Sequence, residues 1–239
     1  MRILVVADVS PVVVRGGGER VMAEQTARLQ QAGHRVRIVC RTPDGERDGA
    51  LVHRAVAVRH FPVTRRSLAA FVRTSITGAR RAVVDELATH GADVLHLHQP
   101  LSALGALTSP AGRRLPSLYT FHSPAPLEFW SRQGTSRRHL GGVLGGGGAA
   151  LLWLLELASL RRATRIHVLS DFSASLLWAL YRIGGDRVVR IPGGVDLERF
   201  CAADPAAARR RLGLAPARPV LFTLRNLEPR MGLARLLGA

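Results

Sequence analysis

The chain of 239 residues contains no lysine, only two cysteines and few aromatic residues. All 34 of its basic side chains are therefore arginines, and because there are 17 acidic residues the formal net charge is +17. Such complete replacement of lysine indicates the codon bias of a GC-rich genome. The basic surface favours anionic partners such as phosphates, anionic lipid or nucleic acid. With 47% hydrophobic residues the chain is too apolar for a disordered tail and has enough apolar content for a core.

The shortage of cysteine excludes a disulfide framework. Cys40 and Cys201 lie far apart in the sequence, and their spacing suggests neither a disulfide network nor a metal knuckle. The N-terminal apolar run Arg2–Ala7 is too short for a signal peptide and is interrupted by Asp8, so it predicts a first buried strand. These features predict a protein of a reducing compartment, and we expect it in the cytoplasm.

A continuous apolar segment long enough to span a membrane is also missing. Leu140–Leu160 carries only one charge, Glu156, but six of its first nine residues are glycine, a poor helix former. Ala149–Leu160 alone is shorter than the roughly 20 residues that a spanning helix needs. The segment therefore predicts a buried or cleft-lining helix, with contact at a membrane interface as the alternative.

Short apolar runs alternate with longer helical patterns, which predicts an α/β fold with a doubly wound, parallel, Rossmann-like sheet. The expected strands are Arg2–Ala7, Arg35–Cys40, Leu51–Val58, Asp93–His98, Ser117–Phe121, Thr164–Leu169, Arg187–Ile191 and Pro219–Leu224. The expected helices are Glu19–Ala32, Ser67–His90, Ala149–Ala163, Phe172–Ile183, Pro205–Leu212 and one that starts at Gly232.

This order of elements predicts one domain over residues 1–200, a linker over 201–218, and the first strand and helix start of a truncated second Rossmann-like domain over 219–239. One strand and part of a helix cannot bury a core, so we expect the chain to be a fragment of a longer protein.

Glycines follow the first strand and open the first helix. Gly16, Gly17 and Gly18 let a ligand approach the backbone closely, and a helix N-terminus attracts anions. The loop lacks the G-x-G-x-x-G spacing of a dinucleotide site, so a simple turn is the alternative.

Three histidines lie at or near strand ends. His122 ends the run Ser117–Phe121, and the prolines after it predict an extended loop. Ligands bind outside the carboxyl ends of parallel strands, so His122 is placed for substrate contact, and we expect His98 to line the same cleft. His96 and His98 share a strand face, because strand side chains alternate. With His122 they offer three nitrogens for zinc, which keeps a metal-dependent hydrolase as an alternative although no fourth ligand is evident.

Several later motifs follow the same logic. Ser170 and Asp171 supply N-cap oxygens for the helix that follows, and Gly184-Gly185 is expected to end it. Pro192–Asp196 has the composition of a tight turn. Arg225 and Arg230 precede a helix start, a combination that favours a diphosphate.

Taken in order, these motifs resemble those of the GT-B retaining glycosyltransferases of family 4, the group 1 class of glycosyl transferases. The matching stretches are Gly16–Arg20 with Gly33–Val36, Asp93–His98, Thr120–Pro124, Val168–Ser173, Ile191–Phe200, and Leu224-Arg225 with Glu228–Leu233. Each stretch is weak alone, but six in the same order across almost the whole chain are specific.

The resemblance implies two Rossmann-like domains that face a cleft, with an acceptor on the N-terminal side and a nucleotide-sugar donor on the other. It implies that Gly17 and Gly18, in one loop with the binding candidate Gly16, lie beside the acceptor and the donor phosphates, that His122 touches the transferred sugar and that Arg225 grips the diphosphate. His98, Ser170 and Arg230 are the further binding candidates. The acceptor, whether glycan, lipid or small molecule, is left open, and no metal or cofactor is implied.

Two departures from the family pattern stand out. Met231 occupies the position of a usual lysine, and the E-x7-E region and nucleotide pocket of the family would lie beyond Ala239. We therefore expect the full-length protein to be a glycosyltransferase and this chain alone to be inactive.

The high net charge suggests two kinds of partner, nucleic acid and an anionic membrane. A nucleic-acid-binding protein would carry its arginines on one face among aromatic platforms, whereas here pairs such as Arg65-Arg66 and Arg80-Arg81 are scattered. No nucleic-acid partner is therefore expected. The same pairs motivate the hypothesis that the protein docks reversibly on the anionic inner face of a membrane.

Overall fold

The computed structural model describes residues 1–14, 16–132, 140–224 and 231–238. The chain divides into two compact units, Met1–Ile191 and Pro192–Ala239. The domain limits expected from the sequence stay a prediction.

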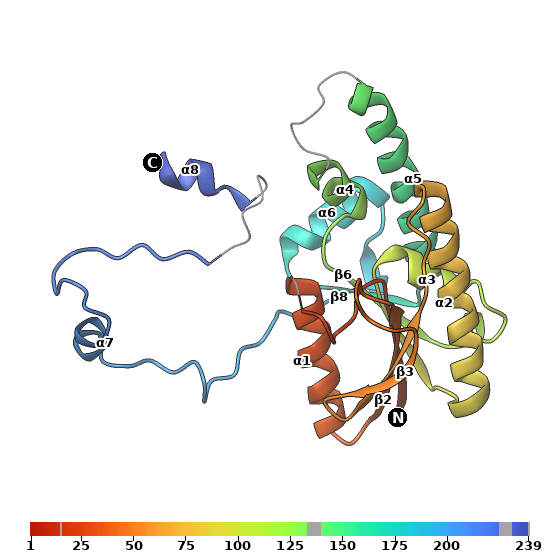
Figure 1. Cartoon of the computed structure of the whole chain (residues 1–239), viewed down its shortest axis with the longest axis horizontal. Helices are drawn as coiled ribbons and strands as arrows, with labels where there is room; N and C mark the ends of the chain where they lie inside the picture. Colours follow the sequence, from red (N-terminus) through yellow and green to blue (C-terminus); the bar gives the residue numbers. More distant parts are fainter. Residues whose placement is uncertain (15, 133–139, 225–230, 239) are drawn as a thin grey trace. The chain divides into compact units, whose positions relative to one another are not determined.

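An eight-stranded sheet forms the centre of the first unit (Figure 1). Its strands are β1 (Arg2–Ala7), β2 (Arg35–Arg41), β3 (Gly49–His53), β4 (Val56–Phe61), β5 (Val94–His98), β6 (Ser117–Phe121), β7 (Arg165–Val168) and β8 (Val188–Arg190). They lie in the order β3-β4-β2-β1-β5-β6-β7-β8, and every pair is parallel except β3 with β4. The reversal of order at β1 and β5 confirms the doubly wound α/β sheet.

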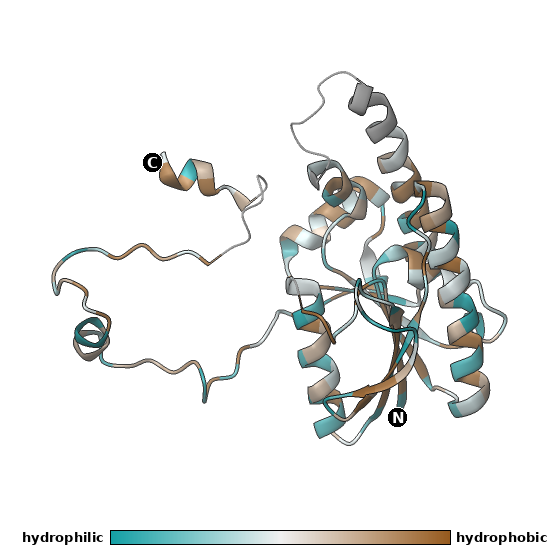
Figure 2. Cartoon of the chain, viewed as in Figure 1, coloured by the Kyte–Doolittle hydropathy of each residue, from teal (hydrophilic) through white to brown (hydrophobic). Residues whose placement is uncertain are grey.

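Helices cover both faces of this sheet. They are α1 (Gly17–Gln31), α2 (Leu68–His90), α3 (Pro100–Leu107), α4 (Ala125–Arg132), α5 (Leu140–Arg162) and α6 (Asp171–Tyr181), with short 3₁₀ turns at Gly112–Arg114 and Gly185–Arg187. Figure 2 shows brown, apolar residues along the strands and a mixture of brown and teal along α1 and α2. That mixture is typical of helices with one face on a sheet and one in solvent.

The hydrophobic core has two parts, one on each face. Met22 of α1 packs with Ile3, Val5 and Ile38 of the first strands. On the opposite face, alternate residues such as Leu4 and Leu95 pack with side chains of α2, α3 and α5. Burial on both faces explains why the central strands are almost continuously apolar.

Three elements of the first unit differ from the sequence prediction. Leu51–Val58 is not one strand but the hairpin β3–β4, because Arg54 and Ala55 adopt positive φ and reverse the chain. The loop expected after His122 is short, since α4 begins at Ala125 and its proline occupies the first turn, where a missing N–H costs nothing. The helix α3 was not predicted, because all eight of its residues are buried and no amphipathic period marks it.

The helix α5 begins at Leu140, earlier than the predicted Ala149. Leu157 and Leu160 are buried in the core whereas Leu154 is exposed, so the predicted buried helix is confirmed for one face of α5. No helix in the described part of the chain is long and apolar enough to cross a membrane. At the end of α6, Arg182 in the left-handed conformation forms the C-cap rather than the two glycines that follow it.

The second unit contains α7 (Pro205–Arg211), capped by Asp204, and α8 (Leu233–Leu237), which follows Gly232. The predicted strand Pro219–Leu224 is not formed, because no other strand among the described residues pairs with it. The predicted turn lies slightly later than expected, at Leu197–Arg199, where Asp196 Oδ1 accepts from the backbone N–H groups of Glu198 and Arg199.

Candidate functional site

Two of the predicted histidines meet at the carboxyl edge of the sheet. His98 ends β5, and His122 directly follows β6, the neighbouring parallel strand. His98 Nδ1 lies 3.0 Å from His122 Nε2, and the two rings stack with centroids 5.2 Å apart. His98 is 1% exposed, so the prediction that it lines a cleft is wrong, whereas His122 is only partly buried. His98 is the inner residue of the pair because it lies within β5, beside Ala7 on the sheet face that α1 covers, whereas His122 follows the end of β6.

A glutamine joins this histidine pair to the glycine loop. Gln99, which follows His98, accepts a hydrogen bond at its Oε1 from the backbone N–H of Asp8, at 3.0 Å. The amide nitrogen of the same side chain lies 3.5 Å from the position that a Cβ on Gly18 would take. The Gln99 side chain, at the end of β5, thus contacts both the end of β1 and the start of α1.

None of the three loop glycines is required by the fold that the described residues form. Gly16 has an extended φ of −152°, a value open to any residue, and a Cβ there meets only the flexible end of Glu19. A Cβ on Gly17 meets nothing within 4 Å, and one on Gly18 makes an ordinary contact. The N-cap of α1 has no side-chain hydrogen bond, so its first N–H groups are uncapped. The loop is therefore open to a ligand rather than packed.

Asp8 has a structural role at the same edge. Its carboxylate accepts the backbone N–H groups of Leu101 and Ser102 at 3.2 and 2.9 Å, and so caps α3. Burial raises the pKa of Asp8, and the nearby Arg41 guanidinium and these hydrogen bonds oppose that shift. The carboxylate fixes α3 behind the histidines.

Four polar side chains line the face of the sheet on which α1 packs. The strand register pairs His96 with Val5 and His98 with Ala7, which both belong to the core beneath α1, and pairs Thr120 with His98 and His167. We call these residues the polar tier; its members are His96, His98, Thr120 and His167. All four are buried.

Within the polar tier, the direction of three hydrogen bonds follows from one carbonyl. The oxygen of Ile191 can only accept, so His167 Nε2, at 2.9 Å, donates to it. A neutral His167 then has a bare Nδ1, which accepts from the Thr120 hydroxyl at 3.2 Å. Thr120 Oγ1 in turn accepts from His96 Nε2 at 2.8 Å.

Burial keeps the site histidines neutral. It lowers the pKa of His96 and of His122 to about 4, with neighbouring histidines as a further cause, and it lowers the pKa of His98 well below the usual 6.5. Near pH 7 each of these rings therefore holds one proton, on one nitrogen.

A buried glutamate anchors the chain just after His122. Glu156 of α5 accepts the backbone N–H of Ala125 at 2.9 Å and the hydroxyls of Tyr119 and Tyr181. Burial raises the pKa of Glu156 to about 7, although these three donors lower it. Nearby, the Ser123 hydroxyl donates to Glu128 at 2.6 Å. Hydrogen bonds thus hold the chain at the start of α4 on both sides of Pro124, at Ser123 and at Ala125.

The structure does not connect the remaining predicted site residues with the histidine pair. Ser170 is the N-cap of α6, as predicted, and its hydroxyl oxygen accepts the backbone N–H of Ser173 at 3.2 Å. Its role in substrate binding stays a prediction. Arg225 and Arg230 lie outside the described residues.

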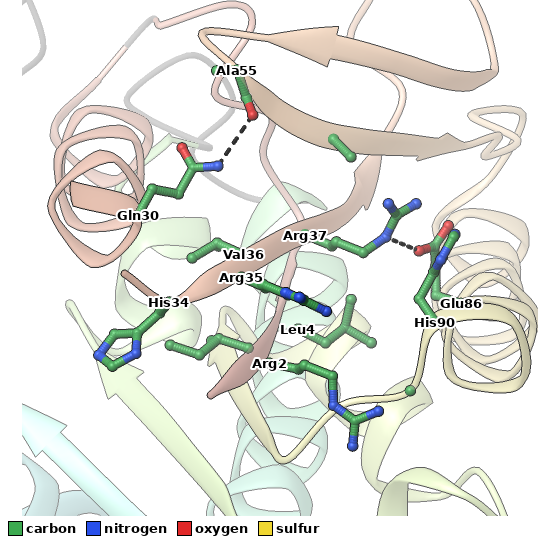
Figure 3. Close-up of a pocket in the computed structure, with 13 residues that line it drawn as sticks. Arg2, Leu4, Gln30, His34, Arg35, Val36, Arg37, Ala55, Glu86 and His90 are labelled. Atoms are coloured by element: carbon green, nitrogen blue, oxygen red, sulfur yellow. Dashed lines mark hydrogen bonds and ion pairs between the residues drawn. The ribbon is translucent and has the colours of Figure 1, made fainter. Parts of the chain in front are cut away.

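A hollow of about 460 Å³ lies at the opposite, amino edge of the sheet, near the starts of β1 and β2 (Figure 3). Its lining includes Arg2, Arg35 and Arg37. Arg2 is paired with Asp93 at 2.6 Å and Arg37 with Glu86 at 2.6 Å. Two of its three arginines are thus neutralised, and it lies at the wrong edge for a parallel-sheet ligand site.

Metal binding by the histidines gains no support from their geometry. No group of three or more His, Cys, Asp or Glu residues is placed to hold a metal ion in the part of the chain that the structure describes. His98 Nδ1 and His122 Nε2 face each other and share one proton, so the two nitrogens are not directed at a common point.

Sequence reasoning missed Asp8, Gln99, Thr120 and His167 as parts of the site. A sequence signal existed for two of them, because Asp8 and Gln99 each follow a predicted buried strand at its carboxyl end. The pairing that brings Thr120 between His96 and His167 depends on strand order, which is not written in any local pattern.

A family model described as Glycosyltransferase Family 4 matches residues 15–199. The chain belongs to Glycosyltransferase Family 4. The resemblance stated from the motifs is thereby confirmed, and the metal-hydrolase alternative is not supported.

Curated relatives resemble parts of the chain. A D-inositol 3-phosphate glycosyltransferase of Nocardia farcinica is 30% identical over 139 residues, which are 57% of this chain and 28% of that protein. An alpha-maltose-1-phosphate synthase of Mycobacterium tuberculosis is 26% identical over 155 residues, 64% of this chain and 38% of that protein. The chain therefore matches well under half the length of these relatives.

Solved structures confirm the GT-B, Rossmann-like fold. A sucrose-phosphate synthase of Thermosynechococcus elongatus matches with a TM-score of 0.74 and 19% identity, over 100% of this chain and 59% of that one. The Anabaena protein Alr3699/HepE, solved in complex with UDP, matches with a TM-score of 0.55 and 16% identity, over 89% of this chain and 50% of that one.

Proposed function

We propose that the protein containing this chain transfers a glycosyl group from a nucleoside-diphosphate sugar to an acceptor, with retention of anomeric configuration. The acceptor hydroxyl oxygen bonds to the anomeric carbon while the bond to the diphosphate breaks, and the hydroxyl proton passes to the leaving phosphate. Such a reaction requires no resident cofactor and no separate general base.

In this proposal each candidate residue has one task. His122 contacts the transferred sugar, and Gly16–Gly18 lie beside the donor phosphates, where the uncapped N–H groups of α1 attract negative charge. Arg225 and Arg230 bind the diphosphate. Charge that develops on the departing phosphate is thus met by fixed donors, the type of stabilisation that lowers a barrier most.

The observation that carries the proposal is the openness of the glycine loop. Glycines that the fold does not need, at the carboxyl edge and in contact through Gln99 with the residues beside His122, are explained by close approach of a ligand to the backbone. Family membership supports transfer of a sugar, and UDP in the Anabaena structure supports a nucleotide donor.

The test is a screen of nucleotide sugars against the full-length protein, with the anomeric configuration of the product read by NMR. Gly17→Ala should leave the free energy of unfolding within about 0.5 kcal/mol, because a Cβ there meets nothing, while it lowers kcat/KM. His122→Ala should lower turnover by roughly 10²-fold or more with a small loss of stability. Equal losses of folding and activity would assign His122 to the core instead.

The 239-residue chain by itself should show no turnover in the same screen. Product formation by it would contradict the proposal that the donor is held mainly by residues outside this chain.

A second part of the proposal concerns the partner. We propose that the protein docks peripherally on an anionic membrane surface through exposed arginines. Arg73, Arg80 and Arg81 of α2 are exposed and have no acidic partner among the described residues. Each contributes about 1 kcal/mol near anionic lipid.

A further inference from the structure

His98 is a buried ring with one nitrogen satisfied and one not. Its Nδ1 contacts His122 Nε2 at 3.0 Å, whereas its Nε2 is buried and has no hydrogen-bond partner among the described residues. The ring of His96 lies against it, with centroids 4.4 Å apart, and offers no directed acceptor to that nitrogen.

The contact between the two nitrogens requires one shared proton, and for two neutral rings only two arrangements exist. If His122 Nε2 donates, then His98 Nδ1 is bare and the His98 proton must sit on the orphaned Nε2. If His98 Nδ1 donates, then the orphaned Nε2 is a bare acceptor. Buried N–H groups without a partner are rarer in folded proteins than under-satisfied acceptors, so the second arrangement is favoured.

The choice at His98 fixes the tautomer of His122. When His122 Nε2 accepts the proton of His98, the proton of a neutral His122 must sit on Nδ1. His122 is only partly buried, and its Nδ1 has no hydrogen-bond partner in the described ranges. That N–H is the donor left to meet a ligand.

We propose that His98 is a positioning residue: it donates its Nδ1 proton to His122 and thereby presents the His122 Nδ1–H to a hydroxyl oxygen of the transferred sugar. The assignment of the sugar as ligand rests on the proposed function. The tautomers themselves do not, since they follow from contacts within the unit Met1–Ile191.

Two-bond nitrogen–proton NMR spectra of the ¹⁵N-labelled 239-residue chain at pH 7 test the tautomers directly. The same spectrum contains both reference patterns. His60 Nδ1 faces the carbonyl of Arg47 at 3.1 Å and must carry a proton, and His167 Nε2 faces the carbonyl of Ile191 and must do likewise. His98 and His122 should both show the His60 pattern. A His122 spectrum of the His167 pattern would overturn the proposal.

Two substitutions of His98 supply the second measurement. Asparagine places an amide donor near the position of Nδ1, so His98→Asn should keep His122 in the Nδ1–H form. His98→Leu removes the donor and should release His122 into a mixture of tautomers. An unchanged His122 in the leucine variant would contradict the proposal, and the wild-type spectrum decides it even if that variant fails to fold.

Kinetics of the full-length protein separate this proposal from the proposed function. His98→Leu should lower kcat/KM by about 10- to 100-fold, as loss of a residue that orients a functional group does, and His98→Asn should recover most of it. If the NMR result holds but no sugar donor reacts, the proposed function and the sugar as ligand fail, and the assignment of the two tautomers stands. If transfer occurs and His98→Leu retains full activity, the positioning role fails alone.

Discussion

Thr120 satisfies two buried histidines with a single hydroxyl. It donates to His167 and accepts from His96, so removal of the hydroxyl leaves a buried donor and a buried acceptor without partners. Each such group costs about 1–3 kcal/mol. Thr120→Val, which keeps the shape, should therefore lower the free energy of unfolding by about 2–6 kcal/mol in urea denaturation. Thr120→Ser keeps the hydroxyl and should lose much less; equal losses in the two variants would show that the methyl group matters rather than the hydrogen bonds.

Glu156 should make stability depend on pH near neutrality. Its pKa of about 7 in the fold lies above the 4.5 of a free glutamate, so the fold favours the protonated form. The contribution is fully present below pH 4.5 and is lost as pH rises through 7. Between pH 5 and 8 the wild type should lose about 2–3 kcal/mol relative to Glu156→Gln, which keeps a neutral side chain at all pH values. The free energy of unfolding, measured across that range, checks this difference.

The exposed Glu24 provides the control for this measurement. Glu24→Gln should follow the wild type throughout, because its side chain is exposed and its surface ion pair with Arg20 contributes little to stability. If Glu156→Gln also follows the wild type, the carboxylate is already ionised in the fold and its three donors outweigh burial.

At the scale of elements, two helical glycines should respond oppositely to the same substitution. A Cβ on Gly105 of α3 would lie 2.4 Å from the backbone oxygen of Ile76 in α2, so Gly105→Ala must push the two helices apart. It should cost about 1–3 kcal/mol or more, as overpacking does. Gly146 of α5 has nothing within 4 Å, so Gly146→Ala should stabilise by about 0.5–1 kcal/mol through helix propensity. Thermal and urea denaturation of both variants measure the two signs, and the same sign for both would refute the contact.

The elements also show how far sequence patterns reach. Strands β1, β2 and β6 and helices α1 and α2 were predicted to within two residues, because their apolar periods and caps are local. The reversal at Arg54-Ala55 was missed because neither residue is a glycine, and alternation of side chains continues through the turn. The segment Pro219–Leu224 has a strand composition but forms no strand, because a ladder needs a partner that composition does not supply.

The candidate site was predictable where strand ends alone determine it. Neighbouring parallel strands bring their carboxyl ends together, so the meeting of His98 and His122 followed from their places in the sequence. Which of the two is buried did not follow, because it depends on the side-chain direction at the last residue of β5. The link through Gln99 depends on its backbone at φ 66°, an unusual value for a non-glycine residue.

At the scale of the whole molecule, the net charge of +17 can attract an anionic membrane only where arginines are exposed and unpaired. Many arginines are engaged: Arg59 pairs with Asp85, and Arg187 donates to the backbone carbonyls at the end of α5. The apolar segment that motivated membrane contact is partly accounted for as well, since Leu157 and Leu160 lie in the core. The docking hypothesis therefore rests mainly on exposed arginines such as those of α2.

We expect salt-sensitive binding of the protein to anionic vesicles and none to neutral vesicles in co-sedimentation. Three exposed arginines at about 1 kcal/mol each give weak attraction, which salt screens beyond about 8 Å at physiological ionic strength. Arg80→Glu with Arg81→Glu should abolish binding at low salt, because both residues lie on the exposed side of α2. The matched control, Arg161→Glu with Arg162→Glu at the end of α5, changes the net charge equally but leaves α2 intact and should retain most of the binding. Equal losses in the two double variants would show that net charge, rather than the α2 surface, attracts the vesicles, and no binding of the wild type at low salt would refute docking altogether.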